Sequence, residues 1–279
     1  MLKNIFSLII CSVIVANSFG QYLNIATYNI RYDNPGDSLD LWQKRYPSIG
    51  GIIQFYDFDI LGTQEGLIHQ LNDLKSLLPE YNYIGVGRDD GKSAGEHAAI
   101  FYKTTKFKLL EKGNFWLSQI TDTPNKGWDA ALPRICTWGK FTEVATGFTF
   151  YMFNVHFDHK GVEARKESAK LILSKISDIA GKTPAILTGD FNVDETNESY
   201  TLLNASKNLK DAYDLAKIRF APNGSFNSFS PTSKQVGRID HIFLTPQFNV
   251  LRYGILTNTV HGRYPSDHFP VFIQVGFKK

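Results

Sequence analysis

The 279-residue sequence contains only two cysteines, Cys11 and Cys136, and it has no long apolar run after its first twenty residues. A chain so poor in cysteine cannot be held together by a disulfide framework and must rely on a hydrophobic core, for which its length is ample. Lys and Arg exceed Asp and Glu by only three. This small excess gives no support for a large anionic polymer as partner, although it leaves a local basic patch open.

Residues 1–20 resemble a secretory signal peptide. Lys3 supplies a positive charge, an apolar run too short to span a bilayer follows, and small residues stand at the −3 and −1 positions before Gln21. A buried N-terminal strand is the alternative, but a strand rarely runs so long without alternation. We therefore expect cleavage near Gln21 and a secreted or periplasmic protein that retains Cys136 alone and has no transmembrane segment.

Strand-like and helix-like segments alternate along the rest of the chain. Helical spacing of apolar residues predicts helices over 41–55, 67–78 and 163–179. Strands are predicted up to residue 30 and at 60–62, 83–86, 98–102, 107–117, 137–144, 148–156, 185–188, 239–244, 250–256 and 269–275. Runs of adjacent strands interrupted by a few helices predict an α/β fold in which two mixed sheets pack face to face with helices outside.

Five short polar clusters follow apolar strand-like runs. They are Asn29, Glu65, His156, Asp190 with Asn192, and Asp267 with His268. Polar residues at the ends of buried strands are where α/β proteins build their sites, and these residues supply the oxygen ligands and imidazoles that a divalent cation and a phosphate ester require. Because the clusters must converge and no cut leaves them all on one side, we expect residues 21–279 to form one domain.

Each cluster alone is weak evidence. Asn and Gly-Asp after a strand are often turn formers, and a single histidine such as His156 is more often a satisfied core residue. The combination is informative, because Asp240 adds a further carboxylate beside an apolar strand and buried carboxylates without partners are costly. So many acidic groups at strand ends indicate a cation, and carboxylate and amide oxygens suit Mg²⁺ better than Zn²⁺.

Two other apparent motifs fail on inspection. Asp190 to Asp194 begins like a calcium loop, but Glu195 stands where that loop requires glycine. The segment 85–91 resembles a nucleotide-binding loop, but its third glycine is one residue late and no helical pattern follows. We interpret that segment as a turn.

Taken in order, the polar motifs resemble the signature of the endonuclease/exonuclease/phosphatase superfamily, which includes deoxyribonuclease I, abasic-site endonucleases, sphingomyelinases and inositol-phosphate phosphatases. The motifs are Tyr28-Asn29, Gln64-Glu65, Asn154-Val155-His156, Gly189-Asp190-Phe191-Asn192, Arg238-Ile239-Asp240-His241-Ile242 and Ser266-Asp267-His268-Phe269-Pro270. Segments 87–91, 95–97, 115–118 and 127–131 are similar to a branch of secreted bacterial members. The resemblance implies a four-layer α/β sandwich with the site at one edge of the two sheets.

The resemblance also implies a metal site and a set of groups around the reacting phosphate. Glu65 would be the principal ligand of Mg²⁺ or Mn²⁺, assisted by Asn29 and Asp267. Asp190 and Asn192 would orient the attacking water and the scissile phosphate.

Two histidines would flank the phosphate as protonated imidazoles, with roles in proton transfer and charge stabilisation. His268 would pair with Asp240, and His156 would pair with Glu96. Imidazoles that neutralise developing charge address the main barrier to attack on an anionic phosphoester. Whether Asp190 or His268 takes the proton from water stays open.

The candidates for substrate contacts are Arg134, Trp116 and Trp128. Arg134 could clamp a phosphate through its planar guanidinium, with a surface charge at a strand edge as an equal alternative. Trp116 and Trp128 could form a stacking wall for a sugar, a base or a choline-like group, although burial in the core is the commoner fate of tryptophan. His159 and Arg165 belong to the same branch-specific part.

The sequence therefore predicts a secreted, monomeric, Mg²⁺-dependent phosphoesterase that acts on a small or medium-sized phosphodiester such as a sugar, nucleotide or lipid head-group ester. A nonspecific extracellular endonuclease is the runner-up. The near-neutral charge counts against nucleic acid, because duplex binding depends on Lys and Arg. A catalytically inactive binding module on the same scaffold is the third possibility, and the complete set of site residues opposes it.

Overall fold

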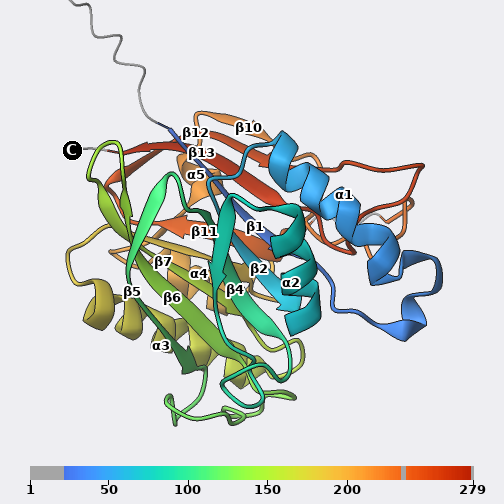
Figure 1. The fold of residues 1–279 in the computed structure, drawn as a ribbon. Helices are drawn as coiled ribbons and strands as arrows, with labels where there is room; N and C mark the ends of the chain where they lie inside the picture. The colour runs from blue at the N-terminus through green and yellow to red at the C-terminus, as the bar shows by residue number, and fades with distance from the viewer. Residues whose placement is uncertain (1–21, 234–236, 278–279) are drawn as a thin grey trace, which may run out of the picture.

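The computed structural model describes residues 22–233 and 237–277, so the predicted signal peptide lies outside the described residues. Two mixed sheets dominate the fold (Figure 1). Sheet A contains, in spatial order, β10 (Ile218–Phe220), β12 (Phe248–Ile255), β13 (Val271–Phe277), β1 (Leu23–Asn29), β2 (Ile60–Gly66), β4 (His97–Lys103) and β3 (Tyr81–Ile84). Sheet B contains β5 (Phe107–Trp116), β6 (Ile135–Glu143), β7 (Thr149–His156), β8 (Ala185–Asp190), β11 (Asp240–Leu244) and β9 (Lys210–Asp211).

Helices cover the outer faces of both sheets. The helices α1 (Trp42–Phe55) and α2 (Ile68–Leu77) lie side by side, and α3 (Val162–Ala180) lies apart from them with α4 (Glu198–Asn204) (Figure 1). The short elements are η1 (Pro35–Asp40), a 3₁₀ helix, and α5 (Ala212–Leu215). The layers run helix, sheet, sheet, helix, which confirms the predicted four-layer sandwich.

Three main apolar clusters hold these layers together. One lies between the sheets and joins residues such as Ile25 of β1 and Ile186 of β8. A second joins α1 and α2 to sheet A, and a third packs Ile172 of α3 against Leu187 of sheet B. Burial on both faces explains why the central strands read as nearly continuous apolar runs.

The main differences from the predicted elements occur at strand ends and in short segments. β2 continues to Gly66 and β8 to Asp190, beyond the predicted ends at 62 and 188. Both extensions consist of polar or small residues, which an apolar pattern does not mark. The short elements η1, α4, β9, α5 and β10 were not predicted, because segments of two to seven residues are too short to show periodicity.

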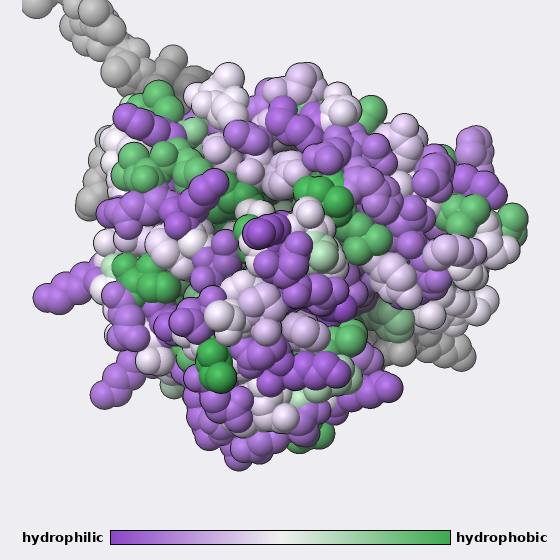
Figure 2. Space-filling view, turned by 60° about the horizontal axis from the view of Figure 1, so that its bottom comes forward, coloured by the Kyte–Doolittle hydropathy of each residue, from purple (hydrophilic) through white to green (hydrophobic). Residues whose placement is uncertain are grey.

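In the part of the chain that is described, no helix is both long and apolar enough to cross a membrane. On the face shown in Figure 2, hydrophobic residues form separate small patches among hydrophilic ones.

Asn154 forms a polar layer between the sheets, next to the strand ends. Its Nδ2 donates to the backbone oxygens of Thr63 (2.8 Å) and Ala99 (2.9 Å) in sheet A. Its Oδ1 accepts from Gln64 Nε2 (2.7 Å) and from Thr188 Oγ1 (3.0 Å). All five residues are buried, so one amide fixes the position of one sheet against the other.

Gly62 makes room for this layer. A Cβ atom at this position would lie 2.4 Å from Asn154 Oδ1 and 2.4 Å from Thr188 Oγ1, closer than atoms can approach. The absence of a side chain on β2 therefore lets the amide of β7 reach the backbone of sheet A.

We predict that Asn154→Ala lowers the free energy of unfolding by about 3 kcal/mol or more, because it leaves several buried polar groups without partners. Urea unfolding followed by circular dichroism measures the change. The control is Asn249→Ala, which removes an exposed asparagine of β12 and should change stability by no more than about 0.5 kcal/mol. A loss below about 1 kcal/mol for Asn154→Ala would show that the layer is not what fixes the two sheets.

Candidate active site

Strand alternation brings four of the predicted residues into the seam between the sheets. Ile25 of β1 belongs to the core between the sheets, and Asn29 keeps the same phase four residues later. His156, Asp190 and Asp240 are likewise in phase with inward apolar residues of β7, β8 and β11. In the sheet B ladder, Asp190 lies between His156 on one side and Asp240 on the other.

Glu65 reaches the seam by a different route. Gln64 occupies the inward phase of β2, so strict alternation would aim Glu65 at the helices. The pairing of β2 with β4 is irregular between Thr63 and Gly66, and Glu65 has a φ of 66°. This bulge turns the carboxylate back toward the seam, a common use of bulges beside active sites.

Three residues of the site have strained backbone conformations. Arg31 (φ 57°), Glu65 and Asn192 (φ 52°) all have left-handed backbone conformations, which non-glycine residues adopt rarely. Such conformations persist where the surrounding structure imposes them, and they cluster at functional sites.

Asp190 stands at the centre of the site. Its Oδ2 accepts a hydrogen bond from Asn29 Nδ2 (3.0 Å) and lies 3.5 Å from His156 Nε2 and 3.7 Å from His268 Nε2. Its Oδ1 accepts from the backbone N–H of Asn192 (2.9 Å). The carboxylate is therefore fixed at both oxygens.

Asn29 connects the two sheets at the site. Its Nδ2 donates to Glu65 Oε1 (2.9 Å) as well as to Asp190, while its Oδ1 accepts from the backbone N–H of Arg31 (3.0 Å). In this arrangement Asn29 acts as a donor to carboxylates. This differs from the sequence prediction, in which Asn29 is a direct metal ligand.

His268 and Asp267 lie in the turn before β13. His268 Nδ1 is 2.8 Å from Asp240 Oδ2, so the expected pair is formed. The ring of Phe226 stacks edge-on against the imidazole, with centroids 5.0 Å apart. The backbone N–H of Asn227 donates to the carbonyl of Asp267 (2.7 Å), which anchors the loop of Phe226 to this turn.

The two histidines have opposite pKa shifts. Burial, with Arg134 nearby, holds the pKa of His156 well below its ordinary value. Burial also disfavours the charged form of His268, but ionised Asp240 and Asp190 outweigh it and raise the pKa of His268 well above its ordinary value. His268 therefore carries a positive charge at neutral pH and His156 does not. These directions agree with a charge-stabilising role for His268, and the predicted role of His156 stays a prediction.

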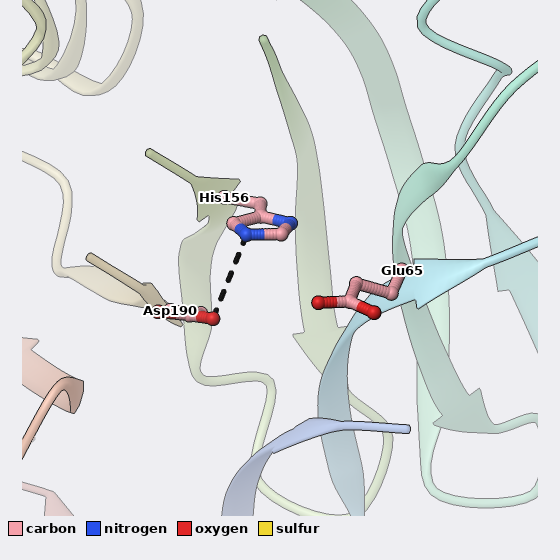
Figure 3. Close-up of side chains that lie close together, drawn as sticks. All are labelled: Glu65, His156 and Asp190. Carbon is pink, nitrogen blue, oxygen red and sulfur yellow. Dashed lines mark ion pairs between the residues drawn. The ribbon is translucent and has the colours of Figure 1, made fainter. Parts of the chain in front are cut away.

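The carboxylates are crowded in a way that favours a bound cation. Burial and the neighbouring Asp240 raise the pKa of Asp190 to about 7, and burial together with Glu65 raises the pKa of Asp267 to about 6. Glu65, His156 and Asp190 each place one potential ligand atom within 4.8 Å of the others. Figure 3 shows these three side chains converging on one space. Acidic groups that destabilise one another in this way fit a divalent cation.

Arg134, the predicted phosphate clamp, lies at the same site. It is only 4% exposed, so the alternative of a surface charge is wrong. Its Nε donates to Asp158 Oδ2 (3.3 Å) and its Nη2 to His159 Nδ1 (3.0 Å), while Nη1 has no hydrogen-bond partner among the described residues. A buried guanidinium with a free donor is a suitable group to meet an anion.

Glu96 pairs with Arg88 and also lies within ion-pair distance of its predicted partner His156. Arg88 Nη1 and Nη2 each lie 2.7 Å from one oxygen of the Glu96 carboxylate. His156 Nδ1 is 3.6 Å from the nearest oxygen and makes no hydrogen bond in the described structure. Planar guanidinium geometry explains the preference for a bidentate pair. Burial nevertheless raises the pKa of Glu96 to about 7.

The residues of the site surround one cavity of about 450 Å³. It is lined by Arg31, Tyr32, Glu65, Glu96, Leu132, Arg134, His156, His159, Asp190, Asn192, Phe226, Asp267 and His268. Most of the predicted site residues thus line one space, while Asn29 and Asp240 lie behind it as partners of the lining groups.

The predicted stacking wall of Trp116 and Trp128 is not formed, since neither lines the cavity. Trp116 is buried against Ala98 and donates from Nε1 to the carbonyl of Arg88 (2.8 Å). Trp128 is half-buried in a loop outside the cavity. Trp116 is therefore buried, as tryptophan more often is.

Sequence reasoning missed four lining residues. They are Arg31, Tyr32, Leu132 and Phe226. Arg31 and Tyr32 directly follow the first polar cluster, and this adjacency was the one available signal. Leu132 and Phe226 lie in loops, and nothing in their sequence context marks them.

The sequence and the fold both match known proteins. The model of the Endonuclease/Exonuclease/phosphatase family matches residues 26–268. A crystal structure of an endonuclease/exonuclease/phosphatase family protein from Bacteroides thetaiotaomicron is 52% identical, with a TM-score of 0.90, over 92% of this chain and 98% of that chain. The mannosyl-6-phosphatase Bt3783 of Bacteroides thetaiotaomicron VPI-5482 is 53% identical, with a TM-score of 0.89, over 91% of this chain and 100% of that chain.

A more distant relative is an uncharacterised protein of Acanthamoeba polyphaga mimivirus, 26% identical over 83% of this chain and 91% of its own length. The family match spans the strand ends that carry the site, from β1 to the turn that holds His268. The chain therefore belongs to the endonuclease/exonuclease/phosphatase family and is a metal-dependent phosphoesterase.

Proposed function

We propose that this enzyme hydrolyses a small phosphoester with Mg²⁺, or Mn²⁺ in its place, and that a sugar phosphate is the first candidate substrate. The observation that carries the proposal is one cavity of about 450 Å³ in which the crowded carboxylates and His268 share the space with Arg134. This volume fits one compact group beside a phosphate. The 53% identical relative named as a mannosyl-6-phosphatase supports a phosphorylated sugar.

Each lining group has a role that follows from its contacts. Glu65 and Asp267 would hold the ion, which neutralises charge on the phosphate oxygens when bound. Asp190, fixed at both oxygens and with a pKa near 7, is placed to orient an attacking water and accept its proton. His268 supplies positive charge, and neutral His156 serves as a hydrogen-bond donor or acceptor.

A sugar monoester is favoured over the phosphodiester expected from the sequence. Arg31 and Arg134 add cationic groups to the cavity beside His268, and a monoester carries more negative charge than a diester. A nonspecific endonuclease is disfavoured, because the formal net charge is only +3 and duplex binding depends on many basic contacts. The compact cavity also favours a single small group over a polymer.

The cellular location and domain organisation of the enzyme are part of what we propose. Residues 1–20 would act as a signal peptide, and residues 21–279 would form one secreted or periplasmic domain that acts as a monomer. The charged n-region, the short apolar run and the small residues before Gln21 support export.

The function is tested with a substrate panel in the presence of Mg²⁺. We expect kcat/KM for mannose 6-phosphate to exceed that for plasmid DNA by at least about tenfold, with weak dependence on salt. Asp190→Asn should lower kcat by about a thousandfold or more while the protein stays folded, because the variant cannot accept a proton from water. Plasmid nicking that outruns every small ester and collapses in high salt would instead establish the nuclease. Absence of turnover on any ester would favour the inactive binding module.

Metal binding should depend on pH in a defined direction. In the metal-free protein the raised pKa values of Asp190 and Asp267 keep both groups protonated at low pH and cost stability as pH rises through about 6 to 7. Saturating Mg²⁺ should therefore raise Tm by about 5 °C or more at pH 8 and by much less at pH 5. Differential scanning calorimetry with and without EDTA measures the shift.

The control for this experiment is Asp267→Asn, which removes one charge and should reduce the Tm shift at pH 8. An equal Tm shift at both pH values would contradict the assignment of Asp267 to the ion. Hydrolysis that continues in excess EDTA would contradict metal dependence itself.

The secretion proposal predicts that the protein made by its native host begins at or within a few residues of Gln21. Intact mass spectrometry measures the mature length. Retention of Lys3 in the mature protein would be incompatible with cleavage.

A further inference from the structure

His159 lines the active-site cavity but lies outside the catalytic cluster, and its side chain is exposed. Its Nδ1 is 3.0 Å from Arg134 Nη2. A guanidinium can only donate, so Nδ1 must accept, and the proton of the neutral ring is on Nε2. Burial and the adjacent Arg134 keep the pKa of His159 below its ordinary value, which maintains the neutral ring. His159 thus offers one N–H donor of defined position.

Asp158 holds this donor in place. Its Oδ1 accepts from the backbone N–H groups of Lys160 (3.0 Å) and Gly161 (2.8 Å). Its Oδ2 accepts from the backbone N–H of Leu132 (3.3 Å) and from Arg134 Nε (3.3 Å). One buried carboxylate therefore ties the loop of residues 131–134 to the loop of residues 157–161. A donor supported in this way is pre-organised for its ligand.

The same cavity offers an acceptor. Arg88 holds the carboxylate of Glu96 through two hydrogen bonds, and Glu96 lines the cavity with His159. A hydroxyl group is both donor and acceptor, so a cavity with a fixed N–H and a fixed carboxylate suits neighbouring hydroxyls. A simple anion would need donors only and would not need the carboxylate acceptor.

The aromatic lining residues do not favour a nucleobase. In the described part of the cavity they are Tyr32 and Phe226. The guanidinium of Arg31 lies over the Tyr32 ring, 4.6 Å from its centroid, and Phe226 contacts the imidazole of His268 edge-on. These contacts occupy part of each ring and leave less aromatic surface for a base. The chemistry of the lining favours a hydroxyl-rich group.

We propose that His159 is a specificity-determining residue, which donates from Nε2 to a hydroxyl or ring oxygen of the sugar that carries the phosphate. The inference rests on the proposed function. It assigns recognition of the sugar to His159 and Glu96, and binding and hydrolysis of the phosphate to Arg134, Asp190 and His268. The phosphate ester and the sugar are therefore recognised by different residues.

The test compares two substrates, mannose 6-phosphate and p-nitrophenyl phosphate, which lacks hydroxyl groups. The readout is the ratio of their kcat/KM values in the intact enzyme with Mg²⁺. His159→Ala should lower this ratio about tenfold or more, through KM for the sugar phosphate rather than through kcat, because a hydrogen bond of the bound sugar is lost. Lys160→Ala, which changes an exposed neighbour that does not line the cavity, should leave the ratio unchanged.

Two conservative variants separate substrate recognition from support of Arg134. The side-chain amide of asparagine is separated from Cα by as many bonds as Nδ1 of histidine. The side-chain amide of glutamine is separated from Cα by as many bonds as Nε2 of histidine. His159→Gln should therefore retain more of the ratio than His159→Asn. If His159→Asn retains the wild-type ratio, or if Gln is no better than Asn, His159 only positions Arg134 and the proposal is overturned.

The outcome for the wild-type enzyme distinguishes this inference from the proposed function. Hydrolysis of p-nitrophenyl phosphate with a ratio that does not change in any His159 variant would overturn sugar recognition alone. Failure of the wild type to hydrolyse either ester with Mg²⁺ would overturn the proposed function, and the inference with it.

Discussion

The site depends on bringing together carboxylates that repel one another. Glu65 comes from sheet A and Asp190 from sheet B, and the amide of Asn29 donates to both. Such an arrangement is stable only if the two sheets are held in fixed alignment, because a charged group without its partner is costly in a buried place. The layer of Asn154 supplies that alignment next to the strand ends, and Gly62 leaves the space for it.

The electrostatic character of the cavity follows from its carboxylates and from Arg134. Asp240 and Asp190 favour the charged form of His268 despite its burial, while burial and Arg134 disfavour the charged form of His156. Two imidazoles near the same Asp190 oxygen therefore differ in charge at neutral pH. Environments that move the pKa values of similar groups in opposite directions let one site hold a cation and a neutral hydrogen-bonding group together.

How much of this could be predicted from the sequence depended on where apolar runs end. Asn29, His156 and Asp190 each follow an apolar strand-like run, and the fold class was predicted from the same runs. The orientation of Glu65 could not follow from alternation, since a bulge and a positive φ reverse it. The partner of Glu96 depends on where Arg88 lies in space, which no spacing rule gives.

The division of the site between strands and loops has a consequence for specificity. Asn29, His156 and Asp190, which belong to the proposed hydrolytic site, sit at strand ends, where changes would disturb the sheets. Arg134 and His159 sit in or beside loops that are joined through Asp158, outside the core clusters. Loops tolerate change better than the elements they connect. Under the proposed division of roles, substrate specificity can therefore change through the loops of Arg134 and His159, while the chemistry at the strand ends remains the same.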